Sequence, residues 1–293
     1  MTGRLPDVGK LMRHFLIITN TYKDENGRLT GELAAYIRKK GGECDCFYSD
    51  GESKSEAAPA LDKMDPATDC VMVLGGDGTL IRAASRLVDS RIPLIGVNLG
   101  TVGYLCELEE SNVFDAVDRL MADDCMVEER MMLETVVKRE GKVVYRDTAL
   151  NDAVLTKGSV ARVLDLEVTG DRVTITAFSG DGVIICTPTG STAYSMAAGG
   201  PIVEPSAKNI IVTPICAHSL KVKPMVLDRD RTVGVRLEQG SRRSAYLSVD
   251  GGKSYKVLSS DRVEVRRAEQ VTRLIRLSGR SFYELIHQKL GKG

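Results

Sequence analysis

The sequence predicts a two-domain α+β protein, in which a doubly wound α/β domain precedes an antiparallel, β-sandwich-like domain. Two observations predict this class: apolar runs alternate with segments of helical period up to about residue 125, and apolar residues alternate with period two beyond it. The length supports two domains, since 293 residues, 43% of them hydrophobic, exceed the usual single domain. We place the domains at residues 1–125 and 126–270, and expect residues 271–293 to return to the first domain.

The first half has the β-α-β rhythm of a parallel, Rossmann-like sheet. Apolar runs at 14–19, 70–74 and 93–98 predict buried strands. A helix is predicted by Leu29, Leu33, Tyr36 and Ile37, with a stop at Gly41 and Gly42, and further helices are predicted over about 78–88 and 112–122, the last with Ser111 as its N-cap. Alternation of this kind predicts a mostly parallel sheet over about residues 10–125.

The second half consists of short alternating segments separated by turn signals. The signals are Glu140-Gly141, Thr169-Gly170-Asp171 and Gln239-Gly240-Ser241. Residues 162–190 predict successive strands, and similar segments recur at 232–240, 244–252, 256–268 and 272–279. The tail predicts a helix that docks on the first domain through one apolar face, formed by Phe282, Leu285, Ile286 and Leu290.

Composition argues against several classes of partner. Lys plus Arg equals Asp plus Glu at 40 each, which gives no electrostatic support for a nucleic-acid or membrane surface. The N-terminus lacks an apolar core with a small-residue cleavage site, and nowhere do 18 apolar residues run together, so we expect a cytoplasmic protein. The seven cysteines include one close pair, Cys44 and Cys46, without the spacing of a zinc site, which predicts reduced, mostly buried thiols.

A glycine-rich loop, Gly75-Gly76-Asp77-Gly78-Thr79, lies between a buried strand and the start of a helix. Free N–H groups at such a place bind anions, but the spacing matches neither a Walker A loop nor the dinucleotide fingerprint. An aspartate among phosphate-binding amides repels phosphate unless a divalent cation lies between them or the carboxylate faces an acceptor hydroxyl. Both arrangements belong to phosphoryl transfer. The alternative is that Asp77 caps the following helix.

The loop resembles the signature shared by NAD kinases, diacylglycerol and sphingosine kinases and, more loosely, phosphofructokinases. Four further segments are similar to motifs of NAD kinases, in that family's order and spacing: "NLGTVGYL" (98–105), "ALNDAVL" (149–155), "DGVIICTPTGSTAYSMAAGGPIV" (181–203) and "HSLKVKPMVL" (218–227). The resemblance covers most of the chain from about residue 70 to 252, and the Thr-Pro-Thr-Gly-Ser-Thr-Ala-Tyr motif is its most specific part.

The resemblance implies transfer of the γ-phosphoryl of ATP, with Mg²⁺ or another divalent metal, to the 2′-hydroxyl of the adenosine ribose of NAD, forming NADP. Asp77 matches the catalytic aspartate, a general base or orienting group. The implied phosphate-facing residues are Gly75, Gly76, Gly78 and Thr79, and Arg82 either steadies a ligand phosphate or is a solvated helix residue. Family members are usually homodimers or homotetramers.

The resemblance also implies an acceptor site assembled from both domains. Asn151 would read adenine and Asp152 would accept ribose hydroxyls; without the family, the pair reads as an Asx turn between strands. Asp181 would bind the nicotinamide amide, from its own or a neighbouring subunit. Implied lining residues of the adenosine pocket are Thr189, Thr192, Ala193 and Tyr194, extended by Ser195, Met196 and Ala197, while Ser191 or Thr192 caps the helix that begins there.

Three positions depart from the family pattern. Tyr104 stands where Phe is usual, Ser179 where many members have Arg or Lys, and Gly252 where many have Gln. The last two bear on how the pyrophosphate is held and on whether NADH is accepted. Two other hypotheses remain at this point: a lipid kinase of the same superfamily, and a catalytically silent NADP-binding sensor.

Overall fold

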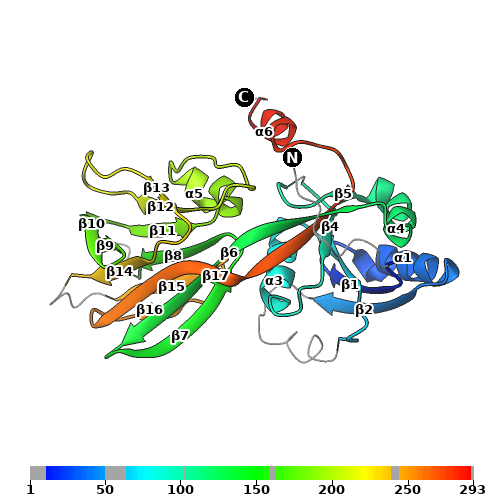
Figure 1. Ribbon diagram of the computed structural model, residues 1–293, viewed down its shortest axis with the longest axis horizontal. Coiled ribbons are helices and arrows are strands. Elements are labelled where there is room, and N and C mark those ends of the chain that lie inside the picture. Colours follow the sequence, from blue (N-terminus) through cyan, green and yellow to red (C-terminus); the bar gives the residue numbers. More distant parts are fainter. Residues whose placement is uncertain (1–10, 50–63, 102, 159–162, 239–243, 292–293) are drawn as a thin grey trace. The chain divides into compact units, whose positions relative to one another are not determined.

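The computed structural model describes residues 11–49, 64–101, 103–158, 163–238 and 244–291 (Figure 1). The chain divides into two compact units, which we call unit 1 (residues 1–129 and 272–293) and unit 2 (residues 130–271). The α+β class with an α/β first part and an antiparallel second part is confirmed. The turn predicted at Gln239-Gly240-Ser241 lies outside the described residues.

Unit 1 contains a parallel sheet in which β4, β3, β1 and β2 are neighbours in that order. Their bounds are β1 His14–Asn20, β2 Glu43–Ser49, β3 Cys70–Gly75 and β4 Leu94–Asn98. Every residue of β3 and β4 is buried, as expected for parallel strands covered on both faces. β5, Leu108–Glu109, and the end of β17, Asp261–Arg276, also pair with β4.

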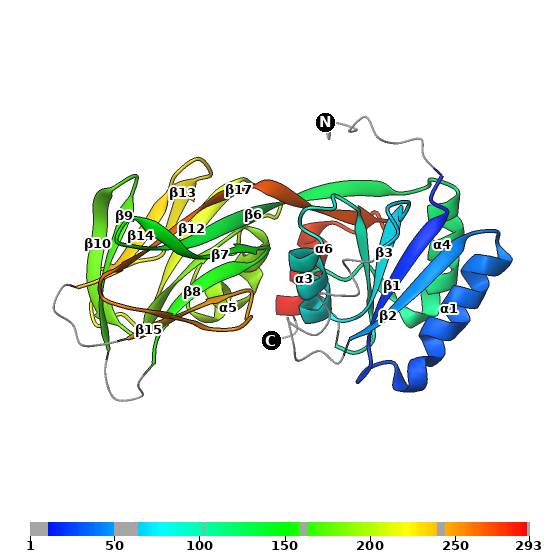
Figure 2. The same ribbon diagram turned by 90° about the horizontal axis from the view of Figure 1, so that it is seen from below.

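Helices cover both faces of this sheet. α1 (Arg28–Lys39) and α4 (Val113–Met121) lie on one face and α3 (Asp77–Arg86) on the other (Figure 2). Leu33 and Ile37 of α1 are fully buried, as their spacing predicted. After β1 comes a 3₁₀ turn, η1 (Glu25–Gly27), and the buried Asp24 carboxylate before it accepts the N–H groups of Leu29 and Thr30, which caps α1.

The predicted N-cap at Ser111 is wrong. Ser111 lies inside a 3₁₀ turn, η2 (Glu110–Asn112), that precedes α4. Glu109 and Asn112 bond reciprocally at the ends of that turn instead. The extra turn moves the start of the helix past Ser111, which a capping residue immediately before an apolar pattern does not reveal.

The C-terminal segment from Thr272 is part of unit 1. Ile275 is buried in its core, and the Glu107 carboxylate accepts the N–H groups of Leu277 and Ser278 at 2.9 and 2.6 Å. α6, Phe282–Leu290, is capped by Ser281. The predicted apolar face is half-buried at Phe282, Leu285 and Ile286, whereas Leu290 is 48% exposed.

Unit 2 is built from antiparallel strands in two layers. One sheet has the order β13-β12-β11-β8-β15-β16, and the other places β10, β9, β14 and β17 side by side, with β6 paired to β17 and β7. The strands are β6 Met126–Arg139, β7 Lys142–Ala149, β8 Asp152–Lys157, β9 Leu164–Gly170, β10 Val173–Gly180, β11 Gly182–Cys186, β12 Asn209–Ile215, β13 Met225–Asp228, β14 Val233–Leu237, β15 Ala245–Val249 and β16 Tyr255–Val257. Alternate residues of both layers, such as Leu155 and Val168, form the core between them.

Two predictions about these strands need adjustment. The turn at Glu140-Gly141 is confirmed by positive φ angles of 50° and 79°. The next turn falls at Asp171 and Arg172, because Gly170 still pairs with Val173 inside the β9–β10 ladder. The segments 256–268 and 272–279, predicted as separate strands, contribute to the single strand β17 over Asp261–Arg276.

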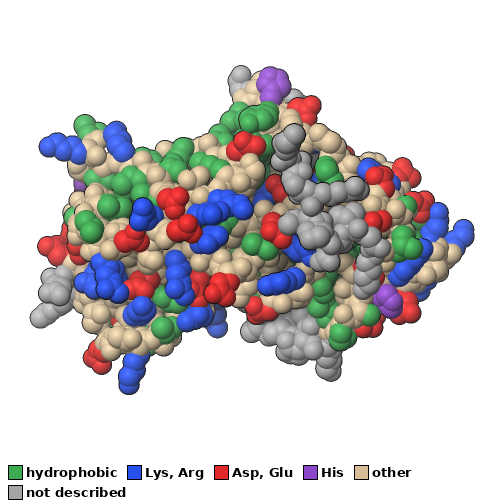
Figure 3. Space-filling model, in the orientation of Figure 1, with side chains coloured by type: hydrophobic (Ala, Val, Ile, Leu, Met, Phe, Trp, Pro, Cys, Tyr) green, Lys and Arg blue, Asp and Glu red, His purple; other side chains and the backbone are tan. Residues whose placement is uncertain are grey.

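The surface and the thiols agree with the composition. Figure 3 shows acidic and basic side chains interspersed, in keeping with their equal numbers. No helix in the described ranges is long and apolar enough to cross a membrane. All seven cysteines lie in those ranges and are free; Cys46 and Cys216 are exposed and the other five are buried or half-buried.

Candidate functional site

The Asp77 carboxylate is fixed by three consecutive backbone amides. It accepts the N–H groups of Tyr104 at 2.6 Å, Leu105 at 3.1 Å and Cys106 at 3.2 Å, all from the loop between β4 and β5. α3 begins at Asp77, yet the Asp77 side chain does not cap it. The capping alternative is therefore wrong, and the carboxylate is tied to a loop that reaches it from the neighbouring strand.

Two glycines make this arrangement sterically possible. A β-carbon at Gly103 would lie 2.1 Å from Asp77 Oδ1, so any side chain there would displace the carboxylate. A β-carbon at Gly75 would lie 2.5 Å from Thr79 Oγ1. Gly75 therefore allows the strand β3 to run directly into the first turn of α3.

Polar groups that the sequence interpretation missed surround the same strand ends. Asn20 ends β1 and Asn98 ends β4, so both lie beside Gly75 at the carboxyl edge of the sheet. Asn98 is 7% exposed; its Nδ2 donates to Gly100 O at 2.7 Å, while its buried Oδ1 has no hydrogen-bond partner. The signal was a polar residue closing an apolar run, at the edge where parallel sheets bind ligands.

Lys23 was also missed, and it extends its ammonium group over the glycine loop. A β-carbon at Gly76 would lie 2.9 Å from Lys23 Nζ, and one at Gly100 would lie 3.4 Å from it. Lys23 is exposed, so its charge is available to a ligand that approaches the loop. Nothing in the local pattern around residue 23 distinguishes this lysine from a surface one.

Arg82 is turned back towards the start of its helix. It is half-buried, with Nη2 3.5 Å from Thr79 Oγ1, and Asn20 Nδ2 approaches the same hydroxyl at 3.4 Å. Burial lowers the pKa of the Arg82 guanidinium. This placement fits a group directed at the loop better than the alternative of a solvated helix arginine.

In unit 2, Asn151 and Asp152 are held by a carboxylate from a distant part of the chain. The Asp250 carboxylate accepts the N–H groups of Leu150, Asn151 and Asp152 at 2.7, 2.8 and 3.0 Å. Asn151 is buried, and its Oδ1 has no hydrogen-bond partner, so the Asx-turn alternative finds no support. Burial, together with the charge of Asp250, raises the pKa of Asp152 to about 7.

The threonine-rich motif packs directly on this pair. Thr187 donates its N–H to Asn151 O at 2.8 Å and its hydroxyl to Leu150 O at 2.6 Å. A β-carbon at Gly190 would lie 2.2 Å from Asn151 O, so the close approach requires glycine. Thr189 Oγ1 accepts Arg130 Nη1 at 3.3 Å and is buried.

The predicted helix cap in this motif is wrong. The residues form a 3₁₀ turn, η3 (Thr189–Thr192), and then a short helix, α5 (Tyr194–Ala197), without a side-chain cap. Ser191 bonds to Pro188 O and to Val203 instead. The Ser195 hydroxyl bonds to Thr213 at 2.8 Å and is fully buried, whereas Tyr194 is 45% exposed.

Other motif residues lie close to these. Thr192, Ala193 and Met196 are half-buried in η3, α5 and the residue between them, and Ala197 is exposed. Asp181, by contrast, lies at the opposite end of the ladder between β8 and β11. Asp152 pairs with Cys186 at one end and Lys157 N donates to Asp181 O at the other, about 16 Å away at ~3.3 Å per residue. Asp181 pairs there with Lys157 Nζ at 2.6 Å.

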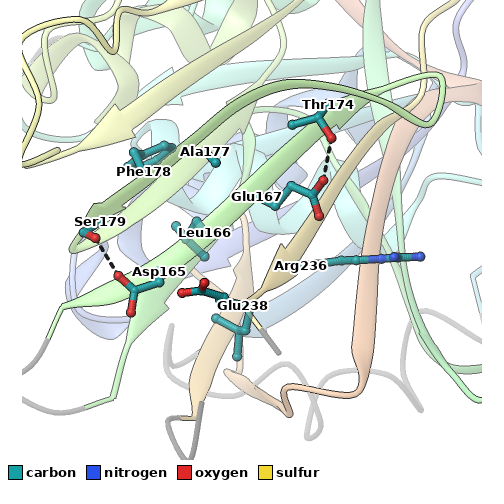
Figure 4. A pocket seen from close by; sticks show the side chains of 10 residues that line it. Asp165, Leu166, Glu167, Thr174, Ala177, Phe178, Ser179, Arg236 and Glu238 are labelled. Carbon is teal, nitrogen blue, oxygen red and sulfur yellow. Dashed lines mark hydrogen bonds between the residues drawn. The ribbon is translucent and has the colours of Figure 1, made fainter. Parts of the chain in front are cut away.

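A pocket of about 440 Å³ opens on β9, β10 and β14 (Figure 4). Its lining includes Asp165, Glu167, Phe178, Ser179 and Arg236, and Ser179 Oγ donates to Asp165 Oδ1 at 2.5 Å. It contains none of the predicted catalytic or binding residues. The departure at Ser179 thus replaces a cation with a hydroxyl that is bonded inside this pocket.

Possible metal ligands are few. Within the described ranges, no group of three or more His, Cys, Asp or Glu side chains converges as a metal site. The oxygen atoms of unit 1 suited to a hard cation near the loop are those of Asp77 and the unpartnered Oδ1 of Asn98.

The sequence matches two family models over most of its length. Residues 15–125 match the ATP-NAD kinase N-terminal domain and residues 150–277 match the ATP-NAD kinase C-terminal domain. The protein named NAD kinase from Agathobacter rectalis is 42% identical over 283 residues, covering 96% of this chain and 99% of that protein. The NAD kinase of Lachnospira eligens is 36% identical over 293 residues, with 95% and 100% coverage.

Two solved structures are similar in fold. The yeast NADH kinase crystallised with NADH aligns with a TM-score of 0.81 and 22% identity, covering 97% of this chain and 88% of that one. The NAD kinase from Archaeoglobus fulgidus in complex with ATP aligns with a TM-score of 0.74 and 21% identity, covering 96% and 99%.

Proposed function

Because the chain belongs to the ATP-NAD kinase family, we propose that it transfers the γ-phosphoryl group of ATP to the 2′-hydroxyl of the adenosine ribose of NAD, forming NADP. The observation that carries the proposal is the Asp77 carboxylate, held by three amides at the edge of the sheet where helix α3 begins. A carboxylate fixed in this way is suited to orient an acceptor hydroxyl.

Unit 1 would bind the phosphates of the donor. The N–H groups at the start of α3 and the ammonium of Lys23 present positive charge at the same loop. Arg82, turned back towards Thr79, would add a second cation. The glycines Gly75, Gly76 and Gly78 would let phosphate oxygens approach the backbone closely.

A divalent cation would arrive with the phosphates of ATP. Mg²⁺ in phosphoryl transfer is commonly bound by substrate phosphates and one or two protein oxygen atoms, and the buried Asn98 Oδ1 fits that role. When bound, the cation supplies charge neutralisation on the phosphates. Its charge also explains how an aspartate can belong to a phosphate-binding loop.

Asp77 would act chiefly by orienting the 2′-hydroxyl and by accepting its proton late in the reaction. In a loose transition state, the bond to the leaving group is largely broken before the nucleophile needs to be deprotonated. The three amide bonds prevent the Asp77 side chain from rotating away, so its oxygen atoms stay in one place for the incoming hydroxyl.

Unit 2 would bind NAD. The unpartnered Oδ1 of Asn151 can accept from the adenine amino group, and Asp152 can accept from the ribose hydroxyls. Thr189, Thr192, Ala193 and Tyr194 would line the adenosine pocket, with Ser195, Met196 and Ala197 extending it. Ser195 would do so through the backbone, because its hydroxyl is committed to Thr213.

Asp181 would serve the nicotinamide of an NAD molecule bound to a neighbouring subunit. The length of β8 separates it from Asn151 and Asp152 within one chain. We propose a homodimer or homotetramer on this ground. Exposed apolar side chains of unit 2 also favour contact between copies: Tyr194 45%, Ile202 38%, Leu220 93% and Val226 50%.

The test is a coupled assay of the purified protein with ATP, Mg²⁺ and NAD, in which an NADP-specific dehydrogenase reports the product. We expect NADP to accumulate with turnover, and NADH supplied in parallel shows whether the reduced acceptor is also used. Tight NADP binding without product would instead indicate the silent sensor. Phosphorylation of diacylglycerol or a sphingoid base, with none of NAD, would indicate a lipid kinase.

A further inference from the structure

Cys44 and Cys46 lie two residues apart on β2, the terminal strand of the sheet in unit 1. Their side chains share a face, because residues i and i+2 of a strand point the same way. Cys44 is buried at 7% exposure, Cys46 is exposed, and the two thiols are hydrogen-bonded to each other. Cys216 is the other exposed cysteine of the seven.

The surroundings favour ionisation of Cys46 over Cys44. The hydrogen bond from Cys44 lowers the pKa of Cys46 to about 7; burial opposes this shift, the Arg38 charge assists it and Asp45 opposes it. Arg38 reaches the pair from α1, with Nη2 2.6 Å from Cys44 O, and β1 contributes the apolar Ile17 opposite Cys46. The same hydrogen bond and burial raise the pKa of Cys44.

We propose that Cys46 is a peroxide-reactive thiolate and that the neighbouring Cys44 is its resolving thiol. In the first step the Cys46 sulfur attacks hydrogen peroxide, an S–O bond forms, the O–O bond breaks and hydroxide leaves. In the second step the Cys44 sulfur attacks Cys46, an S–S bond forms, and the departing hydroxide takes the Cys44 proton as water. Peroxide gains the two electrons that the thiol pair loses.

The geometry of β2 permits this disulfide. Two residues of extended strand span about 6.6 Å between α-carbons, within the upper end of the range, roughly 6.8 Å, that a disulfide bridges. β2 pairs with β1 alone among the described strands, so a small contraction of β2 disturbs one ladder of hydrogen bonds. Thiol chemistry at this edge lies apart from the proposed kinase residues, and its test is independent of theirs.

The first test is alkylation by iodoacetamide across pH 5.5–9.5, with the rate at each cysteine read by mass spectrometry. We expect the rate at Cys46 to reach half its maximum near pH 7 and at lower pH than at Cys216. Cys44→Ala should move the Cys46 midpoint upwards towards that of an ordinary thiol, near pH 8.5, whereas Cys216→Ser should leave it unchanged. A Cys46 profile that coincides with that of Cys216, or one that Cys44→Ala leaves in place, overturns the proposal.

The second test adds one equivalent of hydrogen peroxide at pH 7 in the presence of dimedone. In the wild type we expect the peptide with both cysteines to lose two hydrogen atoms, and in Cys44→Ala we expect dimedone on Cys46. Dimedone on wild-type Cys46 in place of the disulfide, or a disulfide to another cysteine, contradicts the resolving role of Cys44. An unmodified pair contradicts the reactivity of Cys46.

Discussion

Asp77 and Asp250 are held in the same way although they lie in different units. Each carboxylate accepts three consecutive backbone N–H groups, from residues 104–106 and from residues 150–152 respectively. Consecutive amides that converge on one point form a concave site for an anion. In both places the protein's own carboxylate occupies that site and orders a loop next to a functional side chain.

These two residues show what the sequence can reveal at this scale. Asp77 was predicted because glycines flank it within five positions, a local signal. The role of Asp250 was missed because its partners lie about 100 positions away in the chain, at 98 to 100 residues' separation. Lys23 was missed for the same reason: its ammonium meets Gly76 and Gly100 only in the folded chain.

Gly103→Ala should disable the enzyme with little effect on its fold. The new methyl group must displace the Asp77 carboxylate, which a β-carbon would approach to 2.1 Å. We expect kcat for NADP formation to fall by about 100-fold, the cost typical of a misplacement of about 1 Å. Steady-state kinetics measures it, with Gly31→Ala as control, because nothing lies within 4 Å of that position. Unchanged kcat in Gly103→Ala would remove the argument for a fixed carboxylate.

Asp152 should make both NAD binding and stability depend on pH near neutrality. Its pKa is raised to about 7, so the carboxyl is protonated below that pH and ionised above it. An ionised acceptor binds ribose hydroxyls more strongly, so NAD affinity should rise roughly fivefold to tenfold between pH 6 and pH 8. Calorimetric titration of NAD measures the rise, and Asp152→Asn should abolish it.

The stability effect of Asp152 has the opposite sign. An acid with a raised pKa favours folding fully below its unfolded value, near 3.9, and that contribution is lost as pH rises through about 7. Asp152→Asn should therefore gain stability relative to wild type as pH rises from 5 to 8, by up to about 3 kcal/mol. Urea unfolding at the two pH values checks this, and a constant difference would contradict the raised pKa.

At the scale of elements, strand ends organise the proposed donor site. β1, β3 and β4 are parallel neighbours, so Asn20, Gly75 and Asn98 reach one edge of the sheet together. The sequence predicted these strands closely, because their buried apolar runs are bounded by polar or glycine residues. It did not indicate β2, whose alternation of charged residues and cysteines lacks a continuous apolar run.

The loop between β1 and α1 predicts a specific effect on the phosphoryl donor. Asp24 fixes this loop by capping α1, and Lys23 beside it extends over Gly76. Lys23→Met should raise KM for ATP by roughly 10-fold to 100-fold, since a charge-assisted hydrogen bond contributes about 1.5–3 kcal/mol, and should leave KM for NAD nearly unchanged. The matched control is Lys39→Met, an exposed lysine near the end of α1. An equal rise in both constants would place Lys23 outside the donor site.

At the scale of the whole molecule, the family resemblance is confirmed and the fold follows the sequence in outline. Turn residues located the β6–β7 hairpin because Glu140 and Gly141 adopt positive φ angles. The continuity of β17 escaped prediction, because a strand of 16 residues that joins two units has no local stop or start to mark it.

Subunit complementation tests the proposed role of Asp181. Asp77→Asn and Asp181→Asn should each be nearly inactive alone. After the two are mixed, dissociated and reassociated as dimers, half of the dimers are mixed and each carries one complete site, so roughly a quarter of wild-type activity should return. Each variant carried alone through the same procedure is the control. If the mixture stays as inactive as its parents, Asp181 acts within its own chain.

The most direct measurement is the turnover of Asp77→Asn in NADP formation, made beside equilibrium binding of ATP and NAD. The substitution keeps the size of the side chain and an oxygen acceptor for the three amides, but removes the negative charge. We predict a loss of turnover by orders of magnitude with both binding constants nearly unchanged, while Asp115→Asn, an exposed carboxylate of α4, retains full activity. Turnover comparable to wild type would contradict the account, because Asp77 would then have no part in the transfer.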